Sequence, residues 1–329
     1  MLRPIANIIV ADRFKFLGCN AFSVRRSVEN LSATGSITLP RLAVFDNKER
    51  TELAVRESIN NGDKVVIEAG YLETGVTTLF TGYIKTVNVN DRVILSIEDS
   101  MYDLRLKPLV LTKKKVKLKA LLEEILKDTA ITVSDRTTDL LVDEFQYNGN
   151  IAGALAVIKN KLHLTIYISS DNELYAGGEA VEMLSSEERK NATINLTYGI
   201  NIITNNVEYQ TRESKPLKIV CKGKAKNGKE IVATSGMDGG DVQTHYQYEV
   251  TQLKSLQEIA DSIYSKQSYD GFGGTLTIFG YPLAIPGGTV VYRNENYADQ
   301  EGSYFIKGVE TTFGVGGLRQ VLTMGYKLA

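Results

Sequence analysis

Short runs in which apolar and polar side chains alternate fill the first hundred residues of the chain. The runs lie at residues 5–10, 36–39, 64–69, 79–89 and 93–98. Alternation with a period of two is typical of half-buried β-strands. Asn90-Asp91 stands between two runs as a hairpin turn would. The pattern predicts an antiparallel sheet or barrel, within which residues 41–59 break the rhythm as either a short helix or an ordered loop.

Helical periodicity replaces this alternation after residue 108. Apolar residues recur at three- and four-residue spacing in 118–126 and 151–162, and again in a third segment at 255–266, where Ser255 to Glu258 fits a capping box. Each predicted helix has one apolar stripe, which a barrel already closed on itself cannot bury. We therefore expect one peripheral domain whose shared core contains Leu122, Ile125, Leu155, Ile158, Ile259 and Ile263.

Strand alternation returns in the second half, with Asn227-Gly228 placed as a hairpin turn. The predicted strands lie at 192–207, 217–221, 229–233, 274–278, 289–293, 302–312 and 318–326. The expected fold class is mainly β with α+β insertions, with two similar tube-type β-barrel domains plus a peripheral helix-containing domain. The predicted domains are residues 1–107 for the first barrel, 108–190 with 250–273 for the peripheral domain, and 191–249 with 274–329 for the second barrel.

Composition narrows the possible functions. The 329 residues suffice for about two domains, and 38 Lys plus Arg balance 39 Asp plus Glu, so no basic field would attract nucleic acid. No apolar stretch approaches the ~20 residues of a membrane helix, and the N-terminus lacks a secretory signal. We expect synthesis to end in the cytoplasm without membrane insertion. Cys19 and Cys221, far apart in sequence, are expected to be small core residues.

Candidate catalytic residues are few. The chain has two histidines, His163 and His245, neither within a catalytic motif, so both are interpreted as core or surface residues without a role. Glu187 and Glu188 could form a hydrolytic acid pair, but their polar surroundings indicate a solvated loop. The sequence therefore predicts that the protein is not an enzyme and that it has no catalytic residues.

Three further segments invite a ligand-binding interpretation. Met237 to Asp241 is acidic and rich in glycine but lacks the ligand spacing of a calcium loop, so a flexible loop is expected. Gly271 to Gly274 lacks the residues of a phosphate-binding loop and is expected to end the third helix. Lys113 to Lys119 holds five lysines and is expected to be a solvated helix start. No metal, cofactor or nucleic-acid site is predicted.

The order of these elements resembles the late-control protein D family, the baseplate hub proteins of contractile phage tails and related injection systems, including the hub part of type VI secretion spike proteins. Gly62 to Val65, Phe80 to Ile84 and Leu95 to Asp99 resemble the family's first barrel, and Ala154 to Tyr175 its inserted unit. Residues 280–287, 302–304 and 314–322 resemble the closing strands of the family's second barrel. The positions carried over, all structural, are Gly62, Asp63, Gly82, Asp99, Gly280, Pro286, Gly287, Gly302, Tyr304 and Gly314.

This resemblance implies a homotrimer in which two barrels per chain form a pseudo-sixfold ring between a sixfold tail tube and a threefold spike. The implied partners are further copies of the chain, a separate spike protein, the tube protein and surrounding baseplate proteins. Assembly is expected in the bacterial cytoplasm, and the product is part of a virion tail or injection particle. The alternatives are a receptor- or glycan-binding tail-associated protein and, third, a β-rich hydrolase. The host and the type of machine, whether phage, tailocin or secretion system, stay open.

Overall fold

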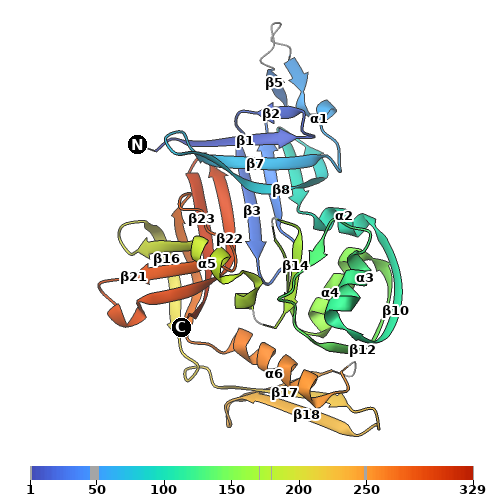
Figure 1. Cartoon of the computed structure of the whole chain (residues 1–329). Coiled ribbons are helices and arrows are strands. Elements are labelled where there is room, and N and C mark those ends of the chain that lie inside the picture. The colour runs from blue at the N-terminus through green and yellow to red at the C-terminus, as the bar shows by residue number, and fades with distance from the viewer. Residues whose placement is uncertain (1, 45–51, 170, 179, 248–249, 329) are drawn as a thin grey trace.

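The computed structural model describes residues 2–44, 52–169, 171–178, 180–247 and 250–328 (Figure 1). Its largest element is a 13-stranded sheet in the order β16-β20-β23-β22-β3-β4-β9-β8-β7-β1-β2, with β15 and β21 attached beside β22. The N-terminal β unit consists of β1 (Pro4–Val10), β2 (Phe14–Phe16), β3 (Ala21–Ser27), β4 (Thr34–Leu39), β7 (Lys64–Tyr71), β8 (Gly75–Val89) and β9 (Val93–Glu98). The C-terminal β unit consists of β15 (Thr193–Thr197), β16 (Ile202–Gln210), β20 (Gly271–Phe279), β21 (Thr289–Arg293), β22 (Gly302–Gly314) and β23 (Gly317–Lys327).

Alternation along the sequence becomes alternation of burial in these strands. In β7, Val65, Ile67, Ala69 and Tyr71 are buried, whereas the residues between them are partly exposed. The predicted hairpin is confirmed, because Val89 pairs with Val93 across the turn. The mainly β fold class is thus confirmed, with strands that keep one face towards a core.

A seam joins the two β units into one sheet. Strand β3 pairs antiparallel with β22, from Phe22 opposite Phe313 to Ser27 opposite Gly308. The rings of Phe22 and Phe313 stack with centroids 5.7 Å apart, and the Ser23 hydroxyl donates to the Glu310 carboxylate at 2.9 Å. The first and last parts of the chain are therefore hydrogen bonded to each other along six residue pairs.

A helix-containing module lies beside this sheet (Figure 1). Its strands form a β10–β12 ribbon and a β11-β14-β13 sheet. The elements are α2 (Met101–Leu106), β10 (Pro108–Lys117), α3 (Leu118–Leu126), β11 (Thr132–Val133), β12 (Leu141–Asn150), α4 (Ile151–Lys161), β13 (Thr165–Ile168), β14 (Glu173–Gly177), the 3₁₀ helix η1 (Ala180–Met183) and α5 (Ser186–Asn191). Helix α6 (Leu253–Gln267), which comes much later in the sequence, packs against the same module.

The shared core of the helices is confirmed. All six apolar residues predicted to meet there belong to one buried cluster, which α3, α4 and α6 build together: Leu122, Ile125, Leu155, Ile158, Ile259 and Ile263. Helix α4 begins after Asn150, whose side chain accepts a hydrogen bond from the Gly153 amide at 2.8 Å. This cap satisfies a backbone donor that the first turn would otherwise leave without a partner.

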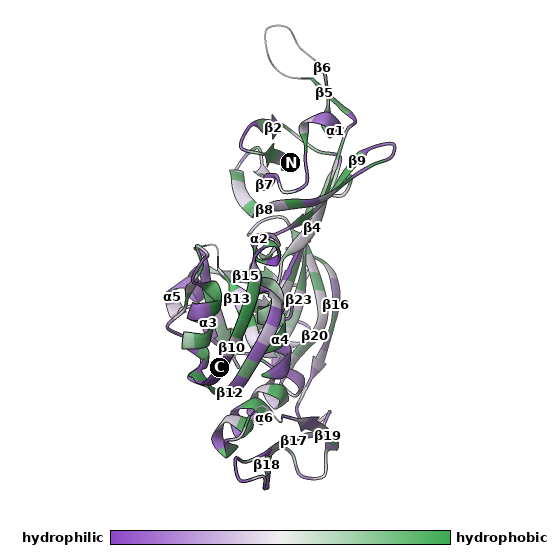
Figure 2. Cartoon of the chain, turned by 90° about the vertical axis from the view of Figure 1, so that its right-hand side faces the viewer, coloured by the Kyte–Doolittle hydropathy of each residue, from purple (hydrophilic) through white to green (hydrophobic). Residues whose placement is uncertain are grey.

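Residues 217–246 depart from their predicted place in the second barrel. They form a separate sheet of β17 (Leu217–Lys224), β18 (Glu230–Gly236) and β19 (Asp241–Tyr246), which lies against α6 (Figure 2). The buried Cys221 joins the α6 core, as expected of a core cysteine. The chain leaves the large sheet at Gln210 and re-enters it at Gly271, which pair with each other. Strand alternation shows that a face is buried, but not what covers it.

Two predicted helix boundaries are wrong. Helix α6 has Gln252 at its N-cap without a side-chain cap, and Ser255 is buried inside the first turn, so the predicted capping box does not form. Gly271 to Gly274 opens β20 instead of ending the helix, which stops at Gln267.

The predicted hairpin turn at Asn227-Gly228 is confirmed by the pairing of Lys224 with Glu230.

The segment left open between 41 and 59 contains both strand and helix. It forms the pair β5 (Leu42–Val44) and β6 (Glu52–Ala54), followed by α1 (Val55–Ser58), while residues 45–51 lie outside the described residues. The remaining element is the 3₁₀ helix η2 (Ala298–Gln300). Within the described parts of the chain, no helix is both long and apolar enough to cross a membrane.

We predict that Ile259→Asp destabilises the protein by about 3–5 kcal/mol, because it buries an unpaired carboxylate in the shared helix core. Leu253→Asp on the same helix is the matched control, since Leu253 is 54% exposed and an acidic residue is favourable in a first turn. Denaturant unfolding measures both variants. Equal losses of unfolding free energy would contradict the shared core.

Candidate functional site

Gly62 and Asp63, the first pair of motif residues, fasten the start of β7 to the middle of β8. The Gly62 amide donates to the Ile84 carbonyl at 2.7 Å, and the Ile84 amide donates to the Asp63 carbonyl at 2.9 Å. The Asp63 carboxylate accepts from the Asn60 amide at 2.8 Å. The acidic residue thus closes the turn that precedes β7.

Gly82 permits a close approach between β8 and β9. A Cβ atom at this position would lie 2.3 Å from the Glu98 carbonyl oxygen and 2.7 Å from the Phe80 ring. The Glu98 side chain is buried and accepts hydrogen bonds from Arg105 and Ser32. Burial acts to raise its pKa, but the bonds from Arg105 and Ser32 hold the pKa of the Glu98 carboxyl below its ordinary value.

Asp99, the neighbouring carboxylate, shifts in the opposite direction. It accepts hydrogen bonds from the Ala33 amide at 2.6 Å and the Met101 amide at 3.0 Å, and so links the start of β4 to α2. Burial nevertheless raises the pKa of Asp99 to about 6. Burial also lowers the pKa of the Arg26 guanidinium, which faces the same region. Glu98 and Asp99 are therefore adjacent acids with opposite electrostatic environments.

A cavity of about 550 Å³ separates the N-terminal β unit from the helix-containing module. Gly82 and Asp99 line it together with Arg26, and Tyr167 closes it from β13. The cavity also reaches Ile285, next to motif residue Pro286. The structure thus brings part of the first motif group close to one member of the second.

Gly280 connects the two β units through a tyrosine. Its amide donates to the Tyr71 hydroxyl at 3.0 Å, and that hydroxyl donates to the Leu318 carbonyl at 3.4 Å. A Cβ atom on Gly280 would lie 2.3 Å from the Leu318 side chain, so a larger residue would push β23 away. Since Tyr71 ends β7 of the N-terminal β unit, this position is a second link across the seam.

Gln320 is a structural residue that the sequence interpretation missed. It is completely buried on β23; its amide oxygen accepts from the Ala284 amide at 2.8 Å, and its amide nitrogen donates to the carbonyls of Phe279 and Pro282 at 3.1 and 2.8 Å. The alternation of β23 could have revealed it, because Gln320 lies on the same buried face as Leu318. One side chain therefore holds the loop between β20 and β21.

The other motif residues of the C-terminal β unit lie apart from one another. Pro286 is buried, and the Gly287 amide donates to the Ile306 carbonyl at 2.8 Å. Gly302 and Gly314 are the two ends of β22; Gly302 faces Tyr292 and Gly314 faces Gly317 across the closing hairpin. These positions shape strand ends and do not form one ligand site.

Tyr304 belongs to an aromatic core. Its ring centroid lies 4.5 Å from that of Phe272 and 6.4 Å from that of Tyr292, and its hydroxyl donates to the Gln300 carbonyl at 2.5 Å. Burial raises the pKa of the Tyr304 phenol above its ordinary value. The residue thus stabilises the C-terminal β unit and the turn before β22.

The two histidines, for which the sequence predicts no role, contact each other although they are far apart in sequence. Their ring centroids lie 5.2 Å apart in an edge-to-face arrangement, with His245 on β19 and His163 after α4. Burial, with smaller contributions from His245 and Lys266, lowers the pKa of His163 to about 4. Among the residues that the structure describes, no group of three or more potential metal ligands includes them.

The expected solvated loop at Glu187 and Glu188 is instead the short helix α5. Glu188 closes a capping box, since its carboxylate accepts from the Ser185 amide at 2.6 Å while the Ser185 hydroxyl accepts from the Glu188 amide. A polar segment can therefore be ordered by its own caps. Met237 to Gly240 form the connection between β18 and β19, where Asp238 pairs with Lys218, whereas Asp241 already belongs to β19.

The lysine-rich segment is also corrected. Its first four lysines lie on strand β10, and α3 begins only at Leu118, so the run is not a helix start. Pairing with β12 accounts for the difference, because the alternation of the ribbon overrides the helical spacing that follows. The observed ion pairs are Lys113–Glu124, Lys114–Glu144, Lys117–Asp139 and Lys119–Asp135.

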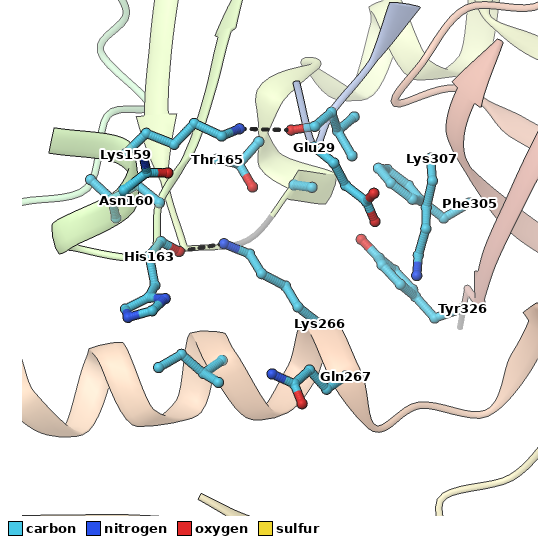
Figure 3. Close-up of a pocket in the computed structure, with 14 residues that line it drawn as sticks. Glu29, Lys159, Asn160, His163, Thr165, Lys266, Gln267, Phe305, Lys307 and Tyr326 are labelled. Atoms are coloured by element: carbon cyan, nitrogen blue, oxygen red, sulfur yellow. Dashed lines mark hydrogen bonds between the residues drawn. The ribbon is translucent and has the colours of Figure 1, made fainter. Parts of the chain in front are cut away.

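A second pocket, of about 350 Å³, lies where four distant segments meet (Figure 3). Lys159 extends from α4, Lys266 from α6 and Lys307 from β22, each half-buried, while Glu29 follows β3 and is exposed. The rest of the wall is mixed. Its apolar and aromatic residues are Val28, Leu164, Ala180, Ile263, Phe305 and Tyr326, and its polar residues are Asn160, His163, Thr165 and Gln267. No sequence motif marked these residues, since they are more than a hundred positions apart in most pairs.

No family model and no curated protein sequence matches the chain. Solved structures do match over nearly its whole length. The tail protein from Neisseria meningitidis MC58 is 14% identical with a TM-score of 0.71, covering 98% of this chain and 96% of that one. The prophage MuSo2 43 kDa tail protein from Shewanella oneidensis is 14% identical with a TM-score of 0.65, covering 98% and 97%.

A protein of the Escherichia coli type VI secretion system is also similar. It is described as resembling T4 bacteriophage tail proteins, is 11% identical with a TM-score of 0.54, and the match covers 94% of this chain and 76% of that one. The chain therefore has the fold of phage tail proteins and of related secretion-system components. The resemblance inferred from the order of elements is confirmed at the level of the fold.

We predict that Asp99 makes stability depend on pH. Because its pKa is raised from 3.8 to about 6, the folded state binds the proton more tightly than the unfolded chain within this window. The free energy of unfolding should therefore fall as pH rises from about 4 to 6, by up to about 3 kcal/mol. Asp99→Asn removes this dependence.

Urea unfolding of both proteins at several pH values between 4 and 7 tests this. The stability of Asp99→Asn relative to the parent should improve by about 2–3 kcal/mol towards pH 7. Asp91→Asn, at the exposed β8–β9 turn, controls for the substitution itself. A difference that stays constant with pH would show that Asp99 does not carry the effect.

We predict that Gln320→Leu lowers the free energy of unfolding by about 3 kcal/mol, because it leaves three backbone groups without the hydrogen bonds of this buried side chain. Gln243→Leu, at an exposed position of β19, is the control and should change stability little. Denaturant titration compares the two. A loss below about 1 kcal/mol at Gln320 would mean that the loop does not depend on it.

Proposed function

We propose that the chain is a structural baseplate hub of a contractile tail or injection system, in which three copies form a pseudo-sixfold ring between the tube and the spike. The observation that carries the proposal is the similarity over almost the full length of both chains to phage tail proteins. The two β units of each protomer, held in one sheet by the β3–β22 seam, would supply six units to the ring. In this role the chain would act without catalysis.

The ring would also explain how the large sheet ends. One terminal strand, β2, has three residues, but the other, β16, has nine, and it pairs on one side only with β20 among the described strands. Long edge strands invite uncontrolled pairing unless something covers them. We propose that a neighbouring protomer covers β16, and that the spike, tube and surrounding baseplate proteins contact the assembled ring.

The molecular mass of the purified protein in solution tests the proposed hub role. We expect the purified chain to be a trimer, alone or with its spike partner, by light scattering coupled to size exclusion. Ile203→Lys places a charge on the exposed β16 edge, where Ile203 is 44% exposed, and should weaken the trimer. Ile94→Lys makes the same change on β9, an inner strand, and should leave the mass unchanged.

A chain that stays monomeric with its spike partner would refute the hub assignment. A trimer that tolerates Ile203→Lys would keep the assignment but move the interface away from β16. The alternative, a receptor- or glycan-binding tail protein, would be favoured by a monomer that binds a glycan with saturation.

A further inference from the structure

Strand β8 changes its partner halfway along its length. Its first half, Gly75 to Tyr83, pairs with β7, and its second half, Tyr83 to Val89, pairs with β9 on the other side. Among the strands that the structure describes, none pairs with the other side of the first half. The backbone groups on that side form an open edge, to which a further strand can add.

The open edge faces the cavity between the N-terminal β unit and the helix-containing module (Figure 1). Six consecutive residues of β8, Thr78 to Tyr83, line this cavity of about 550 Å³. Because the side chains of a strand alternate between two faces, an unbroken run of lining residues indicates that the strand presents its edge. The cavity therefore lies where an added strand would run.

The sequence of this edge does little to prevent strand addition. Edges are commonly protected by charged residues, proline or bulges, and residues 75–82 contain no charged residue and no proline. A bulge at Leu79 does interrupt the pairing with β7 and bends the strand there. We therefore expect an added strand to pair over only a few residues, so that a further interaction must supply part of its affinity.

Arg26 offers that interaction. Its half-buried side chain lines the cavity, and burial lowers the pKa of its guanidinium, an effect that the charge of Asp99 offsets only in part. Within the described parts of the chain, the guanidinium donates no hydrogen bond and forms no ion pair. An arginine withdrawn from water is ordinarily paired, because its charge loses solvation.

The other two charged residues of the wall have partners already. The Asp99 carboxylate accepts hydrogen bonds from two backbone amides, and Lys64 pairs with Asp12 at 3.5 Å. Most of the remaining lining residues carry hydroxyl or amide groups. Arg26 is thus the charge in this cavity that is placed to receive a carboxylate from outside.

We propose that the cavity binds an extended segment of another protein, which adds as a short strand to the open edge of β8 and places an acidic side chain against Arg26. In this mode of recognition, backbone hydrogen bonds give affinity and the side-chain contact selects the sequence. The inference goes beyond the hub role and does not depend on it, because the cavity lies within one chain.

Peptide selection on the full chain tests the proposal. Random heptapeptides displayed on phage are selected for binding to the parent protein and against Thr81→Glu, which introduces a carboxylate at an exposed position of the cavity wall. The selected peptides should share one acidic residue. Its replacement by the corresponding amide should raise the Kd about tenfold in fluorescence anisotropy, since charge-assisted hydrogen bonds are lost.

Backbone N-methylation of the selected peptides reports how they bind. Methylation should weaken binding at every second residue, because alternate amides of an added strand face β8. N-acetylglutamate N-methylamide carries the same carboxylate without the extended backbone, and it should bind at least tenfold more weakly than the peptides.

Matched variants locate the binding. Arg26→Gln should raise the Kd about tenfold and abolish the preference for the acidic peptide over its amide. Arg25→Gln, at the exposed neighbouring position on the opposite face of β3, should change neither. Thr77→Glu is the control for Thr81→Glu, since Thr77 is exposed on the same strand but does not line the cavity. Thermal unfolding verifies that each variant is folded.

The proposal is overturned if selection yields no peptide with saturable binding that Thr81→Glu blocks, or if Thr77→Glu blocks binding equally. Retention of the acidic preference by Arg26→Gln would also overturn it. So would N-methylation effects without alternation, or binding of N-acetylglutamate N-methylamide as tight as that of the peptides, since the cavity would then hold a small acid and not a strand.

Discussion

The pairing of β3 with β22 is the constraint on which the rest of the molecule depends. It joins Phe22 to Phe313 and Ser27 to Gly308, residues from opposite ends of the chain. The strands between them that belong to the same sheet, and the segments that leave it, must all fit without disturbing that register. We expect contacts so distant in sequence to slow folding, because loop closure costs entropy before the contact repays it. Until β22 is in place, β3 would expose an unpaired edge.

Around this seam, polar side chains link neighbouring segments through hydrogen bonds. Tyr71 reaches Gly280 across the two β units, and Gln320 holds the loop that follows. Glu98 and Asp99 lie where the chain passes from β9 into α2. Hydrogen bonds from Arg105 and Ser32 hold the pKa of Glu98 below its ordinary value, whereas burial raises the pKa of Asp99. These links fix the positions of the segments that they join, since buried hydrogen bonds fix geometry more narrowly than apolar packing does.

Periodicity could predict most of the elements but not all of their partners. The apolar stripes of α3, α4 and α6 were enough to place Ile125 and Ile259 in one core. The same rhythm assigned β17 to the wrong neighbours, because alternation gives the buried face and not its cover. Gln320 was readable from its place between Leu318 and Leu322, whereas the lysine pocket was not, since only folding brings Lys159 and Lys307 together.

Residues 211–270 leave the large sheet and return to it at one point, and this arrangement affects which parts of the chain can vary. Gln210 pairs with Gly271, and the Arg212 amide donates to the Asp270 carboxylate at 2.8 Å, so the excursion starts and finishes at one point. Its exposed connections, such as the β17–β18 turn, can change in length while the spacing of its ends stays fixed, whereas α6 must keep the apolar face that completes the shared helix core. Proteins of this fold could therefore differ in these connections, and an engineer could graft a foreign domain into one of them without disturbing the paired ends.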